Sequence, residues 1–337
     1  LEYTYFMKKS INTFLKHPTK DNANRSANPP VIRASTILFN SMQELYQHEK
    51  KIKKHQRISH YSYGRYGSST TIELENMLKE LEQAYHVFLT GTGFGGVALA
   101  IMSLCRPGDE LLVSDNVYGP TKEISEKLLK EFKVLAKFYN PDSFEDLKNK
   151  ITKKTKMILV ENPGSNTFEF QDLSKIVKIA KSRKIFTFLD NTWGTPLYLK
   201  PLKLGFDMSF SSATKYFSGH SDAMGGSLAV NKKVFKQIMF FYKLSGYRMS
   251  ADEAYLIIRG LRTLDTRLKH HSENTKRVIN FLKKQKKIKE ILYPHKQSSK
   301  NFKLWKKYYS GATGLLSIVL KSKKKSSVIK FVNSLEL

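Results

Sequence analysis

Residues 211–222 read Ser-Ser-Ala-Thr-Lys-Tyr-Phe-Ser-Gly-His-Ser-Asp, and the short apolar strand expected at Met208–Phe210 leads directly into them. Lys215 stands there among small hydroxyl residues and aromatic rings, where we expect it to be partly buried. An amine in such surroundings can act as a nucleophile or form a Schiff base with an aldehyde. The hydroxyl groups of Ser212 and Thr214 are suited to binding a phosphate. Taken alone, the segment is better explained as a strand end followed by a polar turn, so the rest of the chain must decide.

Length and composition indicate a globular, soluble protein with one large domain and a smaller one. The chain has 337 residues, of which 40% are hydrophobic, and it contains no apolar run long enough for a membrane span. Cys105 is the only cysteine, which excludes an internal disulfide and is typical of a reducing cytoplasm. The basic Met7-Lys8-Lys9 is not followed by a continuous apolar segment, so a secretion signal is not expected.

The chain is strongly basic, with 58 Lys and Arg against 29 Asp and Glu and a net charge of +29. Such a charge normally raises the question of a nucleic acid or an anionic membrane as partner. Here the basic residues fall on nearly every expected helix, and they are mostly lysine without interleaved arginine and aromatic side chains. We therefore attribute the charge to a general compositional bias, and we expect neither a specific nucleic-acid site nor membrane binding.

Alternating strands and helices predict an α/β fold. Residues 1–60 are expected to form an extended, polar arm that packs on another subunit, and a helix with a Thr70/Glu73 capping box follows the turn-rich residues 61–69. Several later strands are short, continuous apolar runs, as in a mostly parallel sheet that helices cover on both faces. A strand-like run at 314–320 begins a second, smaller domain. The other expected strands are 87–89, 110–113, 134–139, 157–160, 185–189, 208–210 and 227–230, and the expected helices are 94–104, 121–132, 144–151, 173–184 and 251–281.

A glycine-rich turn, Gly91-Thr92-Gly93-Phe94-Gly95-Gly96, lies between an expected strand and an expected helix. With Asp115 after the next strand, its G-x-G-x-x-G spacing fits the dinucleotide-binding loop of an NAD(P)-dependent oxidoreductase. The same geometry serves any phosphate, because free N–H groups and the positive end of the helix dipole attract anions in general. The loop therefore predicts a phosphate site without choosing the cofactor.

Further candidate groups follow strand ends and turns. Asp190 ends a buried strand, where its carboxylate needs a cation or a strong donor, and a protonated pyridine nitrogen would supply one. A helix cap or a turn aspartate is an equally good explanation of Asp190 alone. Tyr118 is placed to stack on a planar ring but alone is more typical of a core residue, and Tyr63 and Arg65 suit a phosphate but alone are ordinary surface residues. The nine histidines show no metal-ligand spacing, so no metal is expected.

Six segments of the chain form one ordered set. They are Tyr63-Gly64-Arg65-Tyr66-Gly67, Asn116-Val117-Tyr118-Gly119-Pro120, Glu161-Asn162-Pro163-Gly164-Ser165, Asp190-Asn191-Thr192-Trp193, Ala213-Thr214-Lys215-Tyr216 with Gly219-His220-Ser221-Asp222, and Arg259-Gly260-Leu261-Arg262-Thr263-Leu264. From about Pro29 to the last residue, the chain resembles the Cys/Met-metabolism group of pyridoxal-phosphate enzymes (fold type I, gamma family), and most closely the bacterial cystathionine beta-lyases.

The resemblance implies a fold type I architecture in three parts. These are an N-terminal arm (1–60) that makes contacts between subunits, a pyridoxal-phosphate-binding α/β domain (61–258) and a smaller C-terminal α/β domain (259–337). Members of the family continue for several tens of residues beyond the point that matches Leu337. We therefore expect the last domain to be incomplete and the arginine that binds the substrate's α-carboxylate to lie beyond it.

The resemblance also implies roles for particular residues. Lys215 would form the Schiff base with pyridoxal phosphate and, with Tyr118, would be catalytic, because Lys215 can remove the α proton and either residue can protonate the departing sulfur. Asp190 would pair with the protonated ring nitrogen, and Tyr118 would also stack on the ring. His220 would be structural. The phosphate would be bound by a larger set, namely the N–H groups of Gly93 and Phe94, the hydroxyls of Ser212 and Thr214, and Tyr63 and Arg65 from the adjacent subunit.

The reaction implied by the resemblance is cleavage of L-cystathionine to L-homocysteine, pyruvate and ammonia by a cytoplasmic homotetramer with shared active sites. The Glu-x-Pro-Gly-Ser and Asp-Asn-Thr-Trp segments favour the lyase branch, since gamma-synthase and gamma-lyase relatives usually carry Asn-Pro and Phe-Ala there. Within the family, a cystathionine gamma-lyase, a gamma-synthase or a methionine gamma-lyase is the alternative. An NAD(P)-binding oxidoreductase is the alternative from another class, but it leaves Lys215, Asp190, Tyr63 and Arg65 unexplained.

Overall fold

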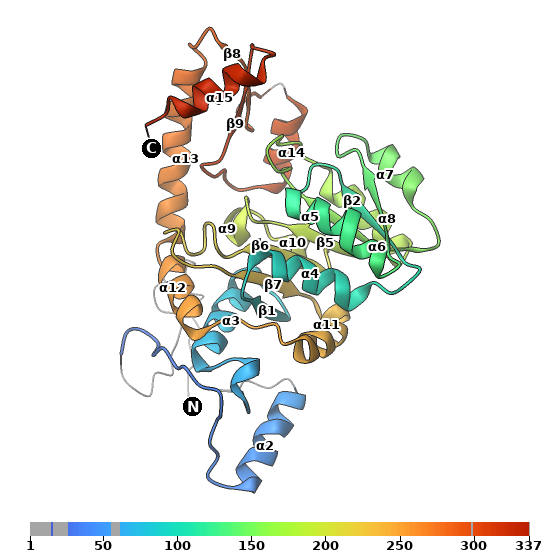
Figure 1. Cartoon of the computed structure of the whole chain (residues 1–337), viewed down its shortest axis with the longest axis vertical. Coiled ribbons are helices and arrows are strands. Elements are labelled where there is room, and N and C mark those ends of the chain that lie inside the picture. The colour runs from blue at the N-terminus through green and yellow to red at the C-terminus, as the bar shows by residue number, and fades with distance from the viewer. Residues whose placement is uncertain (1–14, 16–25, 55–60, 298, 337) are drawn as a thin grey trace, which may run out of the picture.

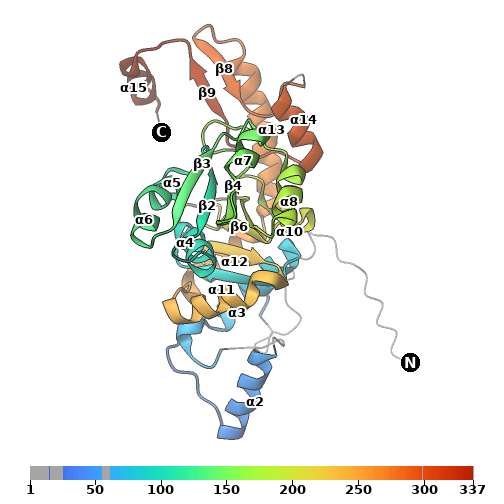
Figure 2. The same ribbon diagram turned by 90° about the vertical axis from the view of Figure 1, so that its right-hand side faces the viewer.

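The molecule is elongated, with helix α2 at one end, a large sheet in the middle and a two-stranded sheet at the other end (Figures 1 and 2). The computed structural model describes residues 15, 26–54, 61–297 and 299–336. Most of the expected arm, residues 1–14, 16–25 and 55–60, therefore lies outside the described part of the chain. Within the described part, α2 (Met42–Lys53) corrects the prediction of an extended arm, because the Ser41 side chain accepts a hydrogen bond from the Glu44 N–H (3.1 Å) and caps a helix there.

The large sheet has seven strands in the order β1-β7-β6-β5-β4-β2-β3. Strand β7 pairs antiparallel with β1 and β6, and every other pair of neighbours is parallel. Each strand falls where a short apolar run predicts one, so the expected α/β class with a mostly parallel sheet is confirmed. The strands are β1 (His86–Thr90), β2 (Glu110–Ser114), β3 (Leu135–Tyr139), β4 (Thr155–Glu161), β5 (Phe186–Asp190), β6 (Met208–Ser212) and β7 (Gly226–Val230).

Helices cover both faces of this sheet (Figure 1). Along β2, Leu111 and Val113 pack in the core beneath α4 and α11, whereas the intervening Leu112 packs on the opposite face beneath α7 and α8. Burial of alternate residues on opposite faces explains why the strands are continuous apolar runs. The helices of this part are η1 (Gly64–Tyr66), α3 (Ser69–Glu82), α4 (Gly93–Leu104), α5 (Gly119–Glu123), η2 (Ile124–Leu128), α6 (Leu129–Glu131), α7 (Phe144–Lys150), α8 (Leu173–Ser182), α9 (Thr195–Tyr198), α10 (Pro201–Leu204), α11 (Lys232–Ser245) and α12 (Ala251–Leu261).

The C-terminal elements surround a small antiparallel pair, β8 and β9. They are connected to the large sheet by Tyr309, whose ring packs edge-on against Phe170 and Trp193. The Trp193 indole N–H also donates to the Leu315 carbonyl oxygen (3.3 Å). The elements are α13 (Leu264–Leu282), β8 (Ile288–Leu292), α14 (Lys300–Tyr308), β9 (Ser317–Leu320) and α15 (Lys325–Asn333).

Three helix predictions need correction. The capping box of α3 is formed by Ser68 and Thr71, with the Ser68 N–H donating to Thr71 Oγ1 (2.9 Å), and not by Thr70 and Glu73. The helix expected over 251–281 is two helices, α12 and α13. The chain breaks between them because the Gly260 carbonyl oxygen accepts hydrogen bonds from the Thr263 N–H (3.1 Å) and from the Arg267 guanidinium (2.7 Å). The helix expected over 121–132 likewise contains one π turn, η2.

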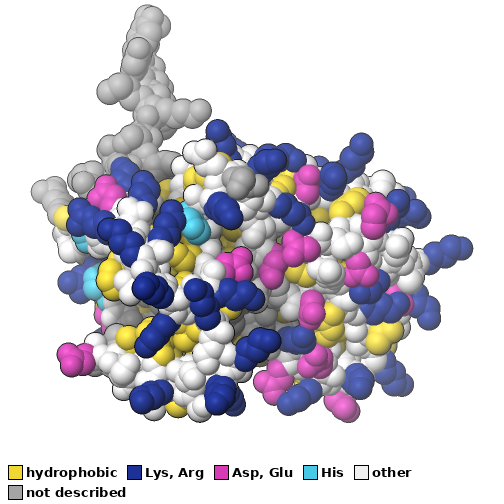
Figure 3. All heavy atoms as spheres, turned by 90° about the horizontal axis from the view of Figure 1, so that it is seen from above, with side chains coloured by type: hydrophobic (Ala, Val, Ile, Leu, Met, Phe, Trp, Pro, Cys, Tyr) yellow, Lys and Arg dark blue, Asp and Glu magenta, His cyan; other side chains and the backbone are white. Residues whose placement is uncertain are grey.

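On the face seen in Figure 3, the described basic side chains do not form one dominant patch. Figure 3 shows Lys and Arg side chains spread over the whole visible face and mixed with acidic and hydrophobic side chains. In the described part of the chain, no helix is both long and apolar enough to cross a membrane.

Candidate active site

Three polar residues end neighbouring strands of the large sheet: Glu161 on β4, Asp190 on β5 and Ser212 on β6. Two positions before each of them stands a hydrophobic residue that packs in the core beneath α4. These residues are Leu159, Phe188 and Phe210. Because side chains alternate along a strand, the three polar side chains lie on the α4 face as well. Ligands of open α/β sheets collect at this carboxyl edge, so the three groups define a candidate site.

The amino-terminal end of α4 lies against this edge. Its cap is Thr92, whose side chain accepts a hydrogen bond from the Gly95 N–H (3.0 Å). The first N–H groups of a helix have no intrahelical acceptor, and the helix dipole makes this end attractive to anions. A Cβ atom on Gly93 would lie 2.5 Å from Ser212 Oγ, so only glycine permits the close approach of α4 to the end of β6. Gly93, Phe94 and Ser212 therefore form a cradle of the kind that binds phosphate.

Two carboxyl groups are neighbours at the centre of the edge. Glu161 and Asp190 are register partners on the parallel strands β4 and β5. Burial raises the pKa of Asp190 to about 6, although hydrogen bonds from Thr192 counteract the shift. Burial and the charge of Asp190 together raise the pKa of Glu161 well above its usual range. Asp190 has a neutral partner, the Thr192 N–H (2.9 Å), so its carboxylate suits an additional, cationic group.

Lys215 lies in the turn that follows β6. Its N–H donates to the Ser212 carbonyl oxygen (3.2 Å), and its carbonyl oxygen accepts from the Gly219 N–H (2.8 Å). The side chain is exposed, so the expected partial burial of Lys215 is wrong for the single chain. The neighbouring Thr214 hydroxyl donates to the Gly225 carbonyl oxygen (3.3 Å) and accepts from the Gly225 N–H (3.1 Å), which engages it within the turn.

Tyr118 is the N-cap residue of α5 and is joined to the site through its main chain. The Tyr118 N–H donates to Glu161 Oε2 at 2.6 Å. This hydrogen bond holds the loop after β2 against the end of β4. The Tyr118 side chain is 53% exposed rather than part of a core. It is thus available to contact a ligand at the carboxyl edge.

Tyr63 and Arg65 belong to a separate part of the single chain. Tyr63 pairs with Thr36 in an isolated β-bridge, and the Arg65 guanidinium lies over the Tyr63 and Tyr66 rings at 5.7 and 5.1 Å from their centroids. None of these contacts, which all lie in the described part of the chain, joins them to Gly93, Asp190 or Lys215. Both side chains are exposed.

Two site residues were missed by the sequence reasoning. Glu161 was noted as part of a motif and given no role, although it ends a predicted strand as Asp190 does. Thr192 donates its N–H to Asp190, and its Oγ1 accepts from the Ser212 N–H (2.9 Å), which ties the ends of β5 and β6 together. Their position directly after apolar strands was the signal that could have identified them.

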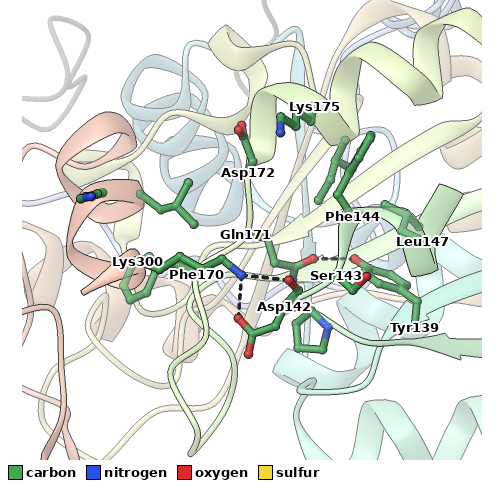
Figure 4. Close-up of a pocket in the computed structure, with 14 residues that line it drawn as sticks. Tyr139, Asp142, Ser143, Phe144, Leu147, Phe170, Gln171, Asp172, Lys175 and Lys300 are labelled. Carbon is green, nitrogen blue, oxygen red and sulfur yellow. Dashed lines mark hydrogen bonds and ion pairs between the residues drawn. The ribbon is translucent and has the colours of Figure 1, made fainter. Parts of the chain in front are cut away.

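A separate hollow of about 590 Å³ lies beside the end of β3 and is lined by residues of β3, α7, α8 and α14 (Figure 4). None of the predicted site residues lines it. Its polar groups are largely paired, since the Lys300 ammonium contacts Asp142 Oδ1 (2.9 Å) and the Tyr139 hydroxyl donates to Gln171 Oε1 (2.9 Å). Among the described residues, no cluster of three or more His, Cys, Asp or Glu is arranged to hold a metal ion.

Comparisons with known proteins cover nearly the whole chain. Residues 12–337 match the family described as Cys/Met metabolism PLP-dependent enzyme. The chain is 36% identical over 300 residues to an L-alanine/L-glutamate racemase of Wolbachia pipientis wMel, covering 88% of this chain and 74% of that protein. It is 32% identical over 335 residues to the cystathionine beta-lyase of Bordetella avium, covering 98% and 83%. The fold is similar to that of cystathionine gamma synthase from Xanthomonas oryzae pv. oryzae, with a TM-score of 0.88, 26% identity and coverage of 97% and 82%.

Proposed function

The chain belongs to the Cys/Met metabolism PLP-dependent enzymes, and from that premise we propose that it cleaves L-cystathionine to L-homocysteine, pyruvate and ammonia. Its cofactor is pyridoxal phosphate, and its fold is the fold type I architecture of that family. The choice of a β-lyase rests on one observation. Over 98% of its length the chain is 32% identical to a cystathionine beta-lyase.

The described residues fit pyridoxal phosphate. The cradle that glycine leaves between α4 and Ser212 suits the phosphate, so we assign to Gly93, Phe94 and Ser212 the role of binding it. Asp190 suits the protonated ring nitrogen, because it is a poorly solvated carboxylate whose described partner is a neutral N–H group. The glycine-rich loop accordingly serves pyridoxal phosphate in this proposal and not the dinucleotide that its spacing also fits. Thr214 is kept as a phosphate ligand only as a prediction, since its hydroxyl bonds to Gly225.

Lys215 and Tyr118 supply the groups that move protons. When bound, pyridoxal phosphate stabilises negative charge on the α carbon of the substrate. The exposed amine of Lys215 is then the base that takes the α proton. Breaking the bond between the β carbon and sulfur requires a proton on the departing sulfur, which the Lys215 ammonium or the Tyr118 hydroxyl can donate. Water completes the balance by converting the remaining three-carbon unit to pyruvate and ammonia.

The assembly belongs to the proposal as well. We infer a homotetramer in the cytoplasm, in which the arm of one subunit (1–60) packs on another and brings Tyr63 and Arg65 to the neighbouring phosphate. Supporting this, the described part of the arm exposes large apolar side chains, among them Leu38 (88% exposed), Met42 and Tyr46. The domain limits 61–258 and 259–337 are proposed from the resemblance to the family.

The identity of the keto acid released from L-cystathionine tests the proposed reaction. Purified protein supplied with pyridoxal phosphate is expected to release pyruvate together with one equivalent of homocysteine, because cleavage on the β side leaves a three-carbon keto acid. Chromatography of the derivatised keto acids distinguishes pyruvate from 2-oxobutyrate. Release of 2-oxobutyrate would contradict the proposal and place the activity in the gamma branch.

Racemisation of an amino acid is a second candidate, favoured by the 36% identity to the Wolbachia racemase. It uses the same removal of an α proton by Lys215 but returns a proton to the opposite side of the α carbon, without loss of a side-chain group. Incubation with L-alanine and chromatography on a chiral column tests it directly. D-alanine formed at a rate that exceeds pyruvate release from L-cystathionine would favour this candidate over the lyase.

A further inference from the structure

We propose that Glu161 is a positioning residue for the cofactor ring, which anchors the main chain at Tyr118 and remains uncharged so that Asp190 carries the single negative charge beneath the ring nitrogen. The inference rests on the proposed roles of Asp190 and Tyr118, but not on the choice of substrate. It concerns a side chain that the sequence motifs leave without a function.

Geometry places Glu161 between the two groups that would hold the ring. It is the last residue of β4 and the register partner of Asp190 on β5. Neighbouring strands lie about 4.8 Å apart, and register partners point to the same face of a parallel sheet, so the two carboxyl groups are adjacent. No other pair of adjacent strand ends on this edge carries two acids, since Ser114 ends β2 and Ser212 ends β6.

The contact between Glu161 and Tyr118 joins two loops. The Tyr118 N–H donates to Glu161 Oε2 at 2.6 Å. Beside it, the Ser165 N–H donates to the Asn116 carbonyl oxygen (2.8 Å), and the Asn116 side chain packs where a Cβ atom on Gly164 would lie. The loop after β2 is therefore fastened to the loop after β4 at two points. The Glu161 contact is the one at Tyr118 itself. It therefore fixes the position of the Tyr118 main chain, from which the aromatic side chain extends.

Electrostatics determines the charge of Glu161. Two adjacent, poorly solvated carboxyl groups cannot both ionise without strong repulsion. Asp190 is stabilised as an anion by the Thr192 N–H and has its pKa at about 6. The pKa of Glu161 is raised well above its usual range by burial and by Asp190, and the hydrogen bonds from Tyr118 and Ser165 offset only part of this shift. Among the described residues, Tyr309 also senses the charge of Asp190, and its pKa is raised mainly by burial. A protonated Glu161 still accepts from the Tyr118 N–H through its carbonyl oxygen.

The test compares Glu161→Gln with Glu161→Ala in the cofactor-loaded protein. Glutamine keeps an acceptor for the Tyr118 N–H and is always neutral, so cofactor affinity within about twofold of wild type is expected, with the same visible circular dichroism band. Alanine removes the anchor, so the dissociation constant of pyridoxal phosphate is expected to rise about tenfold, the effect of losing one buried hydrogen bond, and the dichroic band to weaken. Glu123→Ala, an exposed glutamate on the adjacent α5, is the matched control and should change neither.

Either of two results would overturn the inference. If Glu161→Gln loses cofactor affinity tenfold, a charged Glu161 is required and the uncharged role is wrong. If Glu161→Ala folds and binds the cofactor as wild type does, the anchor has no role. Should Glu161→Ala fail to fold, Glu161→Gln still decides, because the proposal requires this variant to bind normally. Both readouts measure cofactor binding alone, so they stand whether or not L-cystathionine is the substrate.

Discussion

Replacing Lys215 with alanine is expected to lower the rate of pyruvate release from L-cystathionine at least about 10³-fold while leaving the fold intact. The loss is large because one amine both binds the cofactor covalently and transfers the α proton. The fold should tolerate the change, since the Lys215 side chain is exposed and its described hydrogen bonds are made by the main chain. Initial rates and the thermal unfolding midpoint measure the two effects separately.

Lys203→Ala is the matched control for this variant. Lys203 is exposed on the short helix α10, which leads into the start of β6 and not to its carboxyl end, so the control should keep wild-type turnover. Turnover by Lys215→Ala within tenfold of wild type would contradict the assignment of Lys215. A large loss in Lys203→Ala as well would indicate a general effect of removing lysine charge.

Asp190→Asn is expected to lower turnover at least about 100-fold and to weaken binding of pyridoxal phosphate at pH 8. The amide cannot neutralise a protonated ring nitrogen, so the ring would lose the charge partner that makes it an effective electron sink. Equilibrium dialysis gives the cofactor dissociation constant, and initial rates give the loss in turnover. Asp222→Asn, an exposed aspartate in the turn after Lys215, is the control that should leave both unchanged.

The effect of Asp190→Asn on cofactor affinity is expected to depend on pH. In the folded protein without cofactor, burial raises the pKa of Asp190 from 3.8 to about 6, so the carboxylate is ionised above that pH and neutral below it. The ratio of wild-type to variant affinity should therefore be largest near pH 8 and fall as the pH drops through about 6, by at most tenfold per pH unit. Using the ratio cancels the titration of the cofactor itself. A ratio that stays constant between pH 5 and pH 8 would show that the Asp190 charge does not hold the cofactor.

The centre of the sheet was predictable because its strands are buried on both faces, whereas the edge strand β3 is partly exposed. Runs such as Leu111-Leu112-Val113 have no polar residue to confuse a strand with a surface helix, and each run expected to be a strand is one. Breaks within helices were not predictable, because they depend on competition for particular acceptors. The break between α12 and α13 follows from three donors that converge on the Gly260 carbonyl oxygen, one of them the side chain of Arg267 seven residues away.

The site was predictable to the extent that strand ends determine it. Asp190 and Ser212 come together because parallel strands place their carboxyl ends at one edge, and the glycine at position 93 allows α4 to approach that edge. The prediction that Lys215 is partly buried was wrong, because the turn after β6 directs its side chain outward in the single chain. The position of Tyr63 and Arg65 relative to the phosphate was not derivable from one chain, since a neighbouring subunit would have to supply them.

Chemical trapping of the cofactor tests the central claim, that Lys215 is the residue that holds pyridoxal phosphate at this edge. Borohydride reduction of the cofactor-loaded protein, followed by proteolysis and mass spectrometry, identifies the lysine that carries the pyridoxyl group. Lysine is abundant throughout this chain, so the identity of the modified lysine distinguishes Lys215 from many alternatives. We expect one modified peptide, with the pyridoxyl group on Lys215 in the segment 211–222. A pyridoxyl group on a different lysine, or none after reduction of protein that shows the cofactor's visible absorption, would contradict the claim.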